Sequence, residues 1–286
     1  MISNDTVTSK TLGAKTSTSA KATLAKIEAS ETLFGAKSLK SWALILVLVL
    51  FFAGSWRVAE IDLARLITGL PKLWHWISTA WPPKLDELPI FLIRTAETVA
   101  MAAMGTLAAT LAAIPVAVLA SRNITPVAWL YHPTRWLLNA LRGVDSFVFA
   151  LLFVASVGLG PFAGVLGIAL HTWGSAAKFI ADYIENSNLG PFNAVQTTGA
   201  SRTVAISYAV VPEVLPATLS TTLYLFEFNV RASTVLGVVG AGGIGQELKN
   251  SMDLLDFARL ATIIVVILVV VTLIDLTASW LRKKLV

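Results

Sequence analysis

Hydrophobic residues along this chain gather in long runs that are separated by polar segments. A helix needs about 20 mostly apolar residues to cross a bilayer, and we interpret six runs as transmembrane helices. They cover residues 41–59, 91–120, 136–157, 162–184, 213–238 and 257–281. The pattern therefore predicts an all-α membrane protein with about six transmembrane helices.

The polar segments divide the chain into three parts. Residues 1–40 are rich in serine, threonine and lysine and predict a cytoplasmic, largely disordered tail, within which residues 20–33 also suit an amphipathic surface helix. Residues 41–90 form the first span and an outer loop, and residues 91–286 form the membrane core. A cleavable signal is the alternative for the first run. Cleavage needs a small-residue site directly after the run, whereas residues 51–58 include bulky and charged residues, which favours an uncleaved span.

Composition and charge support a membrane protein. Apolar residues make up 56% of the chain, against about 45–50% in soluble domains. The net charge of +5 could indicate nucleic acid, but the basic residues lie beside apolar runs and form no stripe. If both termini are cytoplasmic, 12 Lys and Arg face inward and five face outward, in agreement with the positive-inside rule. We therefore expect a multi-pass protein with both termini in the cytoplasm.

One polar segment, at about residues 185–212, lies among the apolar runs and is expected outside the hydrocarbon. In it, Asn193-Ala194-Val195 are followed by Gly199 and then by Val211-Pro212. This spacing resembles the cytoplasmic coupling loop of binding-protein-dependent ABC importer permeases, although Asn193 stands where that family usually has glutamate. The resemblance implies that an ATPase contacts Asn193, Ala194, Val195, Gly199, Ala200 and Ser201.

Further motifs are similar to those of the phosphonate ABC transporter permease family, over roughly residues 90–286. They are Arg142 to Ala150, Val157 to Leu166 with His171-Thr172, Gly190-Pro191, Thr198 to Ala200, and Phe226 to Val235 running into Gly240 to Gly245. The resemblance implies a type I ABC importer permease fold in the bacterial cytoplasmic membrane. It also implies import of phosphonate, phosphite or hypophosphite by alternating access.

The same resemblance implies the partners of the chain. These are a second permease copy, a separate cytoplasmic ABC ATPase dimer, and a periplasmic or lipid-anchored substrate-binding protein. The chain itself is then a non-catalytic subunit without a cofactor. A permease for a different small solute, a secondary transporter or a channel is the alternative, and association with an ATPase distinguishes these classes.

Charged and polar residues within the spans are costly and often functional. We interpret a polar patch in the fifth run as part of a path for an anion, with a structural ion pair between Arg231 and Glu227 as the alternative. His171, in the fourth run, could donate to the anion or bond a neighbouring carbonyl. The candidate path comprises Arg231, Asn229, Ser233, Thr234 and His171.

Four pairs of opposite charges lie three or four residues apart, a spacing that brings side chains together on a helix. They are Arg94 with Glu97, Arg142 with Asp145, Lys178 with Asp182, and Glu227 with Arg231. We expect these pairs to neutralise each other or to pack against a neighbouring helix. Asp275, in the last run, is expected to meet a backbone group or a basic group on an adjacent helix.

The segment Gly240 to Gly245 fits the dinucleotide-binding pattern G-x-G-x-x-G. That fingerprint also needs a βαβ unit and an acidic residue about 20 positions later, and residues 260–271 contain no acid. The glycines instead predict a tight chain reversal or a close helix approach. The three histidines are scattered along the sequence, which argues against a metal site and a membrane-embedded enzyme.

Overall fold

A computed structural model describes residues 36–285 of the chain, with side chains from residue 41 onward. The predicted tail therefore lies outside the described residues except for its last five, and the surface helix considered at residues 20–33 lies outside them entirely. Every regular element among residues 36–285 is helical. The prediction of an all-α protein is confirmed.

The chain forms two units, which are residues 1–71 and residues 72–286. The first unit holds α2 (Ala36–Val58) and the beginning of α3 (Leu63–Thr79). Within α2, Ser41–Val58 is long and apolar enough to cross a membrane, and no part of that segment is buried. The sequence had indicated only a loop after this span, so α3 is a helix that the sequence analysis missed.

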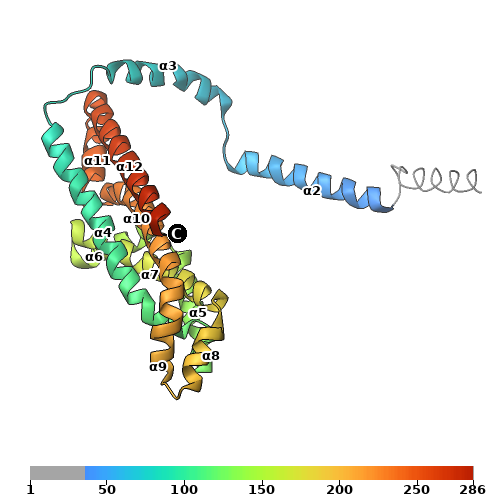
Figure 1. Cartoon of the computed structure of the whole chain (residues 1–286). Coiled ribbons are helices and arrows are strands. Elements are labelled where there is room, and N and C mark those ends of the chain that lie inside the picture. The colour runs from blue at the N-terminus through green and yellow to red at the C-terminus, as the bar shows by residue number, and fades with distance from the viewer. Residues whose placement is uncertain (1–35, 286) are drawn as a thin grey trace, which may run out of the picture. The chain divides into compact units, whose positions relative to one another are not determined.

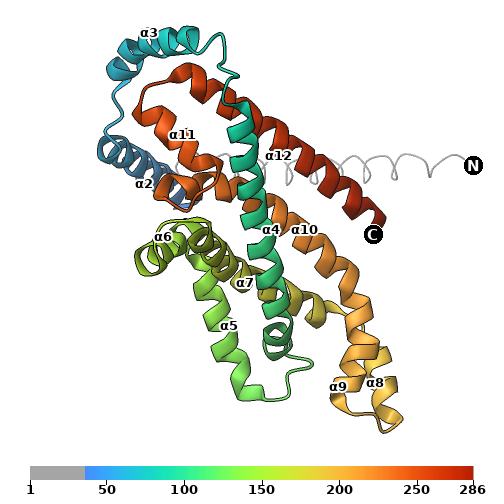
Figure 2. The ribbon, with the colours of Figure 1, turned by 90° about the vertical axis from the view of Figure 1, so that its left-hand side faces the viewer.

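The second unit contains the remaining helices (Figures 1 and 2). They are α4 (Leu88–Leu119), α5 (Ala128–Gly143), α6 (Ser146–Val157), α7 (Pro161–Asn186), α8 (Leu189–Thr197), α9 (Arg202–Ala205), the π-helical turn η1 (Ile206–Val210), α10 (Val211–Leu236), the 3-10 turn η2 (Gly237–Val239), α11 (Ile244–Asp253) and α12 (Phe257–Leu285). In this unit α8 and α9 lie at one end and α11 lies at the other (Figure 2).

Helix α7 is the centre of the second unit, because it packs against α4, α5, α6 and α10. Small residues make this packing close. A Cβ at Gly105 of α4 would lie 2.8 Å from the Ile168 side chain, and one at Gly167 would lie 2.8 Å from the Ala150 backbone. Such close approaches are typical of helices that pack in membranes.

The predicted span at residues 136–157 is wrong as a single helix. It is divided between α5 and α6, which meet at an angle of 87°. Asp145 explains the break, because its carboxylate accepts a hydrogen bond from the Phe147 N–H at 2.8 Å and so caps the start of α6.

Four helical segments among the described residues are apolar enough to be membrane spans, or five if the bent pair counts as one. They are Ser41–Val58, Leu88–Leu119, Arg202–Val239 and Phe257–Leu285, with α5 and α6 as the bent pair. The predicted span at residues 162–184 is a helix, α7, but falls outside this set. Because other helices surround α7, its faces need not be apolar enough to meet lipid.

Candidate functional site

Helix α8 presents two of the predicted ATPase-contact residues on its outer surface. Asn188 caps its start, because the side-chain oxygen accepts a hydrogen bond from the Gly190 N–H at 2.9 Å. Phe192 is only 5% exposed and fixes the helix to the hydrophobic core. Asn193 and Ala194 are exposed. The helix is therefore held from one side and free on the other.

Gly199 ends α8 through its backbone conformation. Its φ is +85°, in the left-handed region that favours glycine, and its N–H donates to the Gln196 carbonyl at 3.0 Å. No atom lies within 4 Å of the position that a Cβ would occupy. The glycine is therefore required by the turn and not by lack of space.

The rest of the predicted loop begins the next helix. Ser201 caps α9, its hydroxyl accepting from the Val204 N–H at 3.4 Å, while Ala200 is half-buried. Val195, on α8, packs against the hydrophobic core instead of facing outward. Of the six residues assigned to ATPase contact, Asn193, Ala194, Gly199 and Ser201 are exposed.

Two polar contacts connect this loop to the helical bundle. The Asn188 N–H donates to the Glu213 carboxylate at 2.7 Å, and the Arg202 guanidinium donates to the Thr125 carbonyl at 3.2 Å. Glu213 lies in the first turn of α10. A displacement of α8 would therefore act directly on α10. The sequence analysis missed Glu213, whose signal was a single acid beside Pro212 at the start of an apolar run.

The structure divides the candidate anion path between two faces of α10. Asn229 and Ser233 are both 0% exposed. The Asn229 amide donates to the Thr106 hydroxyl at 2.8 Å and to the Thr172 hydroxyl at 2.9 Å, and therefore joins α10 to α4 and α7. The Ser233 hydroxyl donates to the Asn229 carbonyl at 2.7 Å. These two residues belong to the interior of the bundle.

Arg231 lies in a cluster of four charges on α10 and α12. Its side chain is 44% exposed, and its guanidinium lies 3.2 Å from Glu227 Oε1 and 3.0 Å from Asp275 Oδ2. Arg282 lies 3.0 Å from Glu227 Oε2. The predicted pair of Arg231 with Glu227 and the expected basic partner of Asp275 are both confirmed, whereas Arg282 was missed because it lies in a basic cluster at the end of the last run.

Arg231 also lines a cavity of about 390 Å³ beside the break between α5 and α6, together with Asp145, Ser146 and Phe147. His171 holds the same break, because its Nδ1 lies 2.8 Å from the Val144 carbonyl oxygen. The alternative in which His171 bonds a neighbouring carbonyl is therefore confirmed. Thr234 donates to the Arg231 carbonyl at 2.6 Å and does not line this cavity.

The other sequence-predicted pairs have different outcomes. Arg94 and Glu97 form an ion pair of 2.9 Å. Lys178 and Asp182 do not pair with each other but contact a neighbouring helix, which was the alternative for this pair, because Lys178 donates to Asn139 at 2.9 Å and Asp182 binds Arg135 at 2.9 Å. Both true partners lie on α5. The sequence spacing could not reveal them, because they depend on how two helices pack.

The pairing of Arg142 with Asp145 is wrong. Both residues are exposed, but the helix ends between them at Gly143, and the Asp145 carboxylate caps α6 instead. The spacing rule holds only within one continuous helix. The break therefore removes the condition on which the pairing was predicted.

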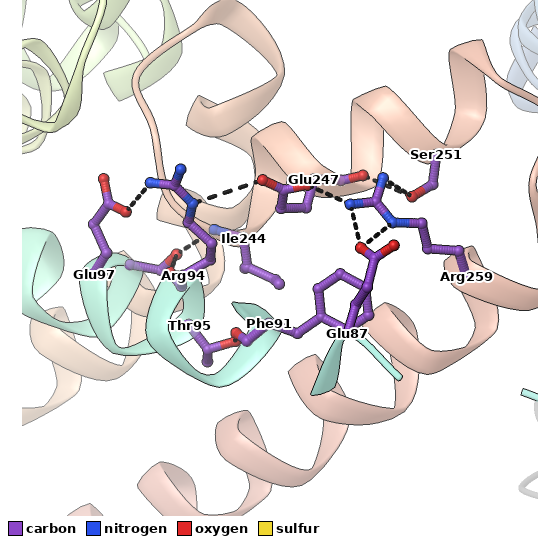
Figure 3. A network of polar contacts seen from close by, with 10 residues as sticks. Glu87, Phe91, Arg94, Thr95, Glu97, Ile244, Glu247, Ser251 and Arg259 are labelled. Atoms are coloured by element: carbon purple, nitrogen blue, oxygen red, sulfur yellow. Dashed lines mark hydrogen bonds and ion pairs between the residues drawn. The ribbon is translucent and has the colours of Figure 1, made fainter. Parts of the chain in front are cut away.

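A polar network joins α4, α11 and α12 at the end of the unit opposite α8 (Figure 3). Arg259 lies 2.8 Å from both Glu87 and Glu247. Arg94 binds Glu97 and also approaches Glu247, at 3.6 Å. Glu247 is thus shared by two arginines. The sequence analysis missed this network, although Arg259 was visible as a charge in the first turn of an apolar run.

A neighbouring ion pair extends the contacts at this end. Lys84 Nζ lies 2.7 Å from Asp256, and the Thr262 hydroxyl donates to the Lys84 carbonyl at 2.7 Å. The Lys84 ammonium, together with the Arg259 N–H, holds the pKa of Asp256 below its usual value. The segment before α4 is thereby fixed to the start of α12.

The glycine-rich segment is a chain reversal, as its composition predicted. Gly240, Gly242 and Gly243 have φ between +73° and +87°. The segment turns into α11, whose first N–H, from Ile244, donates to the Thr98 hydroxyl at 2.9 Å. Within residues 36–285 there is no βαβ unit and no group of three or more metal-ligating side chains.

A family model described as binding-protein-dependent transport system inner membrane component matches residues 113–286. HtxC of Stutzerimonas stutzeri, a permease protein named for a phosphite transport system, is 44% identical over 247 residues, which cover 86% of this chain and 88% of HtxC. PhnE of Mycolicibacterium smegmatis, named as a phosphate-import permease, is 39% identical over 206 residues, which cover 72% of this chain and 39% of PhnE.

Among solved structures, the fold is similar to a chain of the MetNI methionine ABC transporter in an inward-facing conformation. The TM-score is 0.62 at 20% sequence identity, and the match covers 70% of this chain and 99% of that chain. At this identity the likeness establishes the fold alone. The fold is that of a type I ABC importer permease.

Proposed function

We propose a transport function from one premise: the chain belongs to the family of binding-protein-dependent transport system inner membrane components. In this proposal it is the permease subunit of an ATP-driven importer for a small phosphorus oxyanion. The anion class is taken from the names of its relatives, which refer to phosphite and phosphate. Two copies of the chain enclose the path, an ATPase dimer binds on the cytoplasmic side, and a binding protein delivers the anion from outside.

The observation that supports this proposal most is the arrangement of α8 and α9 at one end of the bundle. Asn193 and Ala194 are exposed there, while Phe192 holds α8 to the core. The contact of Asn188 with Glu213 connects the surface to α10. Closure of the ATPase dimer would push α8, and α10 would move with it. The movement of α10 would then open the path alternately to the two sides of the membrane.

The charge cluster on α10 suits the passage of an anion. An oxyanion that leaves water needs compensating positive charge, but a strong site would retain it. Arg231 is partly neutralised by Glu227 and Asp275, remains 44% exposed, and lines a cavity. We therefore place the path along Arg231 and the break near His171, while Asn229 and Ser233 hold the helices together.

Uptake by the assembled transporter in proteoliposomes tests this function. With binding protein outside and ATP available to the ATPase, we expect accumulation of labelled phosphite, and competition by phosphate and methylphosphonate but not by methionine. Omission of the ATPase subunit is the control and should abolish uptake.

Two outcomes separate the parts of the proposal. Uptake without the ATPase would establish a secondary transporter or channel and contradict the family mechanism. ATP-dependent uptake of another solute, without any response to phosphorus oxyanions, would retain the importer and reject its substrate class.

A further inference from the structure

Helix α3 carries a continuous apolar stripe along one face. Its members recur every three or four residues, and each is more than half exposed: Leu63, Leu66, Ile67, Leu70, Trp74 and Ile77. At 100° per residue they occupy a sector of about 100° on the helix. No residue of α3 is buried. The stripe therefore needs a covering surface.

The opposite face of α3 is polar and basic. Arg65, Thr68, Lys72 and His75 project from it, and all four are exposed. A helix with bulky apolar residues on one face and basic residues on the other is typical of helices that lie in the plane of a membrane surface. Lys72 can contact lipid phosphates directly, and Arg65 can do so beside its ion pair with Asp62, 3.1 Å away, while the stripe enters the acyl boundary.

The place of α3 in the chain puts it at a membrane surface. Ser41–Val58 precedes it and Leu88–Leu119 follows it, and both are candidate spans. A segment between two consecutive spans leaves and re-enters the bilayer on the same side. Its 17 residues then lie close to the surface that the two spans share.

A contact inside the second unit fixes the depth of the end of α3. The Trp76 ring stacks on Phe257 with centroids 5.3 Å apart and planes 15° apart. Phe257 is the first residue of the candidate span α12 and therefore lies where that span enters the membrane. Tryptophan is enriched at this level of a bilayer. Trp76 lies on the polar side of α3, so the stack leaves the apolar stripe free.

We propose that α3 lies in the bilayer interface, with its apolar stripe in lipid and its basic face toward anionic headgroups, and anchors the outer end of α12. Its location on the outer side rests on the topology of the proposed importer. Its contact with lipid rests only on the membrane spans, and no part of it depends on which anion is transported.

Cysteine scanning tests this proposal, because the chain has no native cysteine. Spin labels are attached to the single variants Ile67→Cys and Trp74→Cys on the stripe, and to their neighbours Thr68→Cys and His75→Cys on the polar face. The full chain is studied in nanodiscs of phosphatidylethanolamine and phosphatidylglycerol. Collision with lipid-soluble oxygen is compared with collision with a water-soluble nickel chelate.

We expect the ratio of oxygen to nickel collisions to be several-fold higher at positions 67 and 74 than at positions 68 and 75. Equal ratios on the two faces would overturn the proposal. Shielding of positions 67 and 74 from both reagents would also overturn it, because it would identify protein as the cover. The measurement requires no transport. A result that contradicts the location of α3 is therefore distinct from a result that contradicts the proposed function.

Discussion

At the scale of single residues, Asn229 shows how one buried polar side chain can join several helices. Asn229 is fully buried, yet its amide bonds hydroxyls on two other helices. Hydrogen bonds between helices in membranes are worth on average about 0.6 kcal/mol each. The value is modest, but the three helices that meet at Asn229 are α7, at the centre of the unit, and two of the helices that pack against it.

We expect Asn229→Asp to destabilise the protein by about 3 kcal/mol, since it places a carboxylate in the bundle with no basic partner. Asn250→Asp is the matched control, because Asn250 is exposed on α11. Thermal unfolding in detergent measures both variants. Equal melting temperatures for the two would show that position 229 is not enclosed as described.

Variants of Arg231 and its acidic partners can separate an effect on transport from an effect on assembly. Replacing it with glutamine leaves Asp275 without its basic partner, whereas Glu227 retains Arg282. Arg231→Gln alone should therefore reduce the yield of assembled complex, and adding Asp275→Asn should restore it. Adding Glu227→Gln instead should restore less, because it leaves both Asp275 and Arg282 unpaired.

Uptake per assembled complex then decides the role of Arg231. If Arg231 contributes to the anion path, the double variant Arg231→Gln/Asp275→Asn assembles normally and transports poorly. Full recovery of uptake in that variant would make Arg231 a structural member of the ion-pair cluster.

At the scale of elements, short interruptions determine what each helix can do. Asp145 divides a predicted span into α5 and α6, and Gly199 separates α8 from α9. Each interruption has a local chemical cause, in one case a capping carboxylate and in the other a left-handed backbone. The loop that contacts the ATPase in our proposal depends on the second of these.

We expect Gly199→Ala to reduce the stimulation of ATP hydrolysis by substrate-loaded binding protein. A side chain at φ +85° costs roughly 1–2 kcal/mol, and the strain would displace α8 from α9. Gly54→Ala makes the same chemical change in α2, with open space around it and without a positive φ. That control should leave stimulation unchanged, and equal stimulation in both variants would remove Gly199 from the coupling role.

At the scale of the whole molecule, the pairing of two helices relates the C-terminal end of α12 to the α8–α9 loop. Glu227 of α10 pairs with Arg282 of α12, and the later residue Arg231 pairs with the earlier residue Asp275. The two helices are therefore antiparallel. The C-terminal end of α12 points toward the side on which α10 begins, which is the side of α8 and α9.

Labelling of single cysteines in intact cells tests this topology. A cysteine at Gln196 should be protected from an impermeant reagent, and one at Leu254 should react with it. Both positions are exposed, Gln196 on α8 and Leu254 directly after α11, and these two helices lie at opposite ends of the unit (Figure 2). Reaction from outside at position 196 would reverse the predicted orientation.

The sequence by itself determined the class of the protein, because membrane helices are specified by long apolar runs that need no knowledge of packing. It also located the coupling-like loop and the pair of Arg231 with Glu227, since both depend on residues close together in the chain. Only the tertiary structure decided the partners of Lys178, the network around Glu247, and the burial of Asn229. Those contacts join residues far apart in sequence, and their energies depend on which helix faces meet.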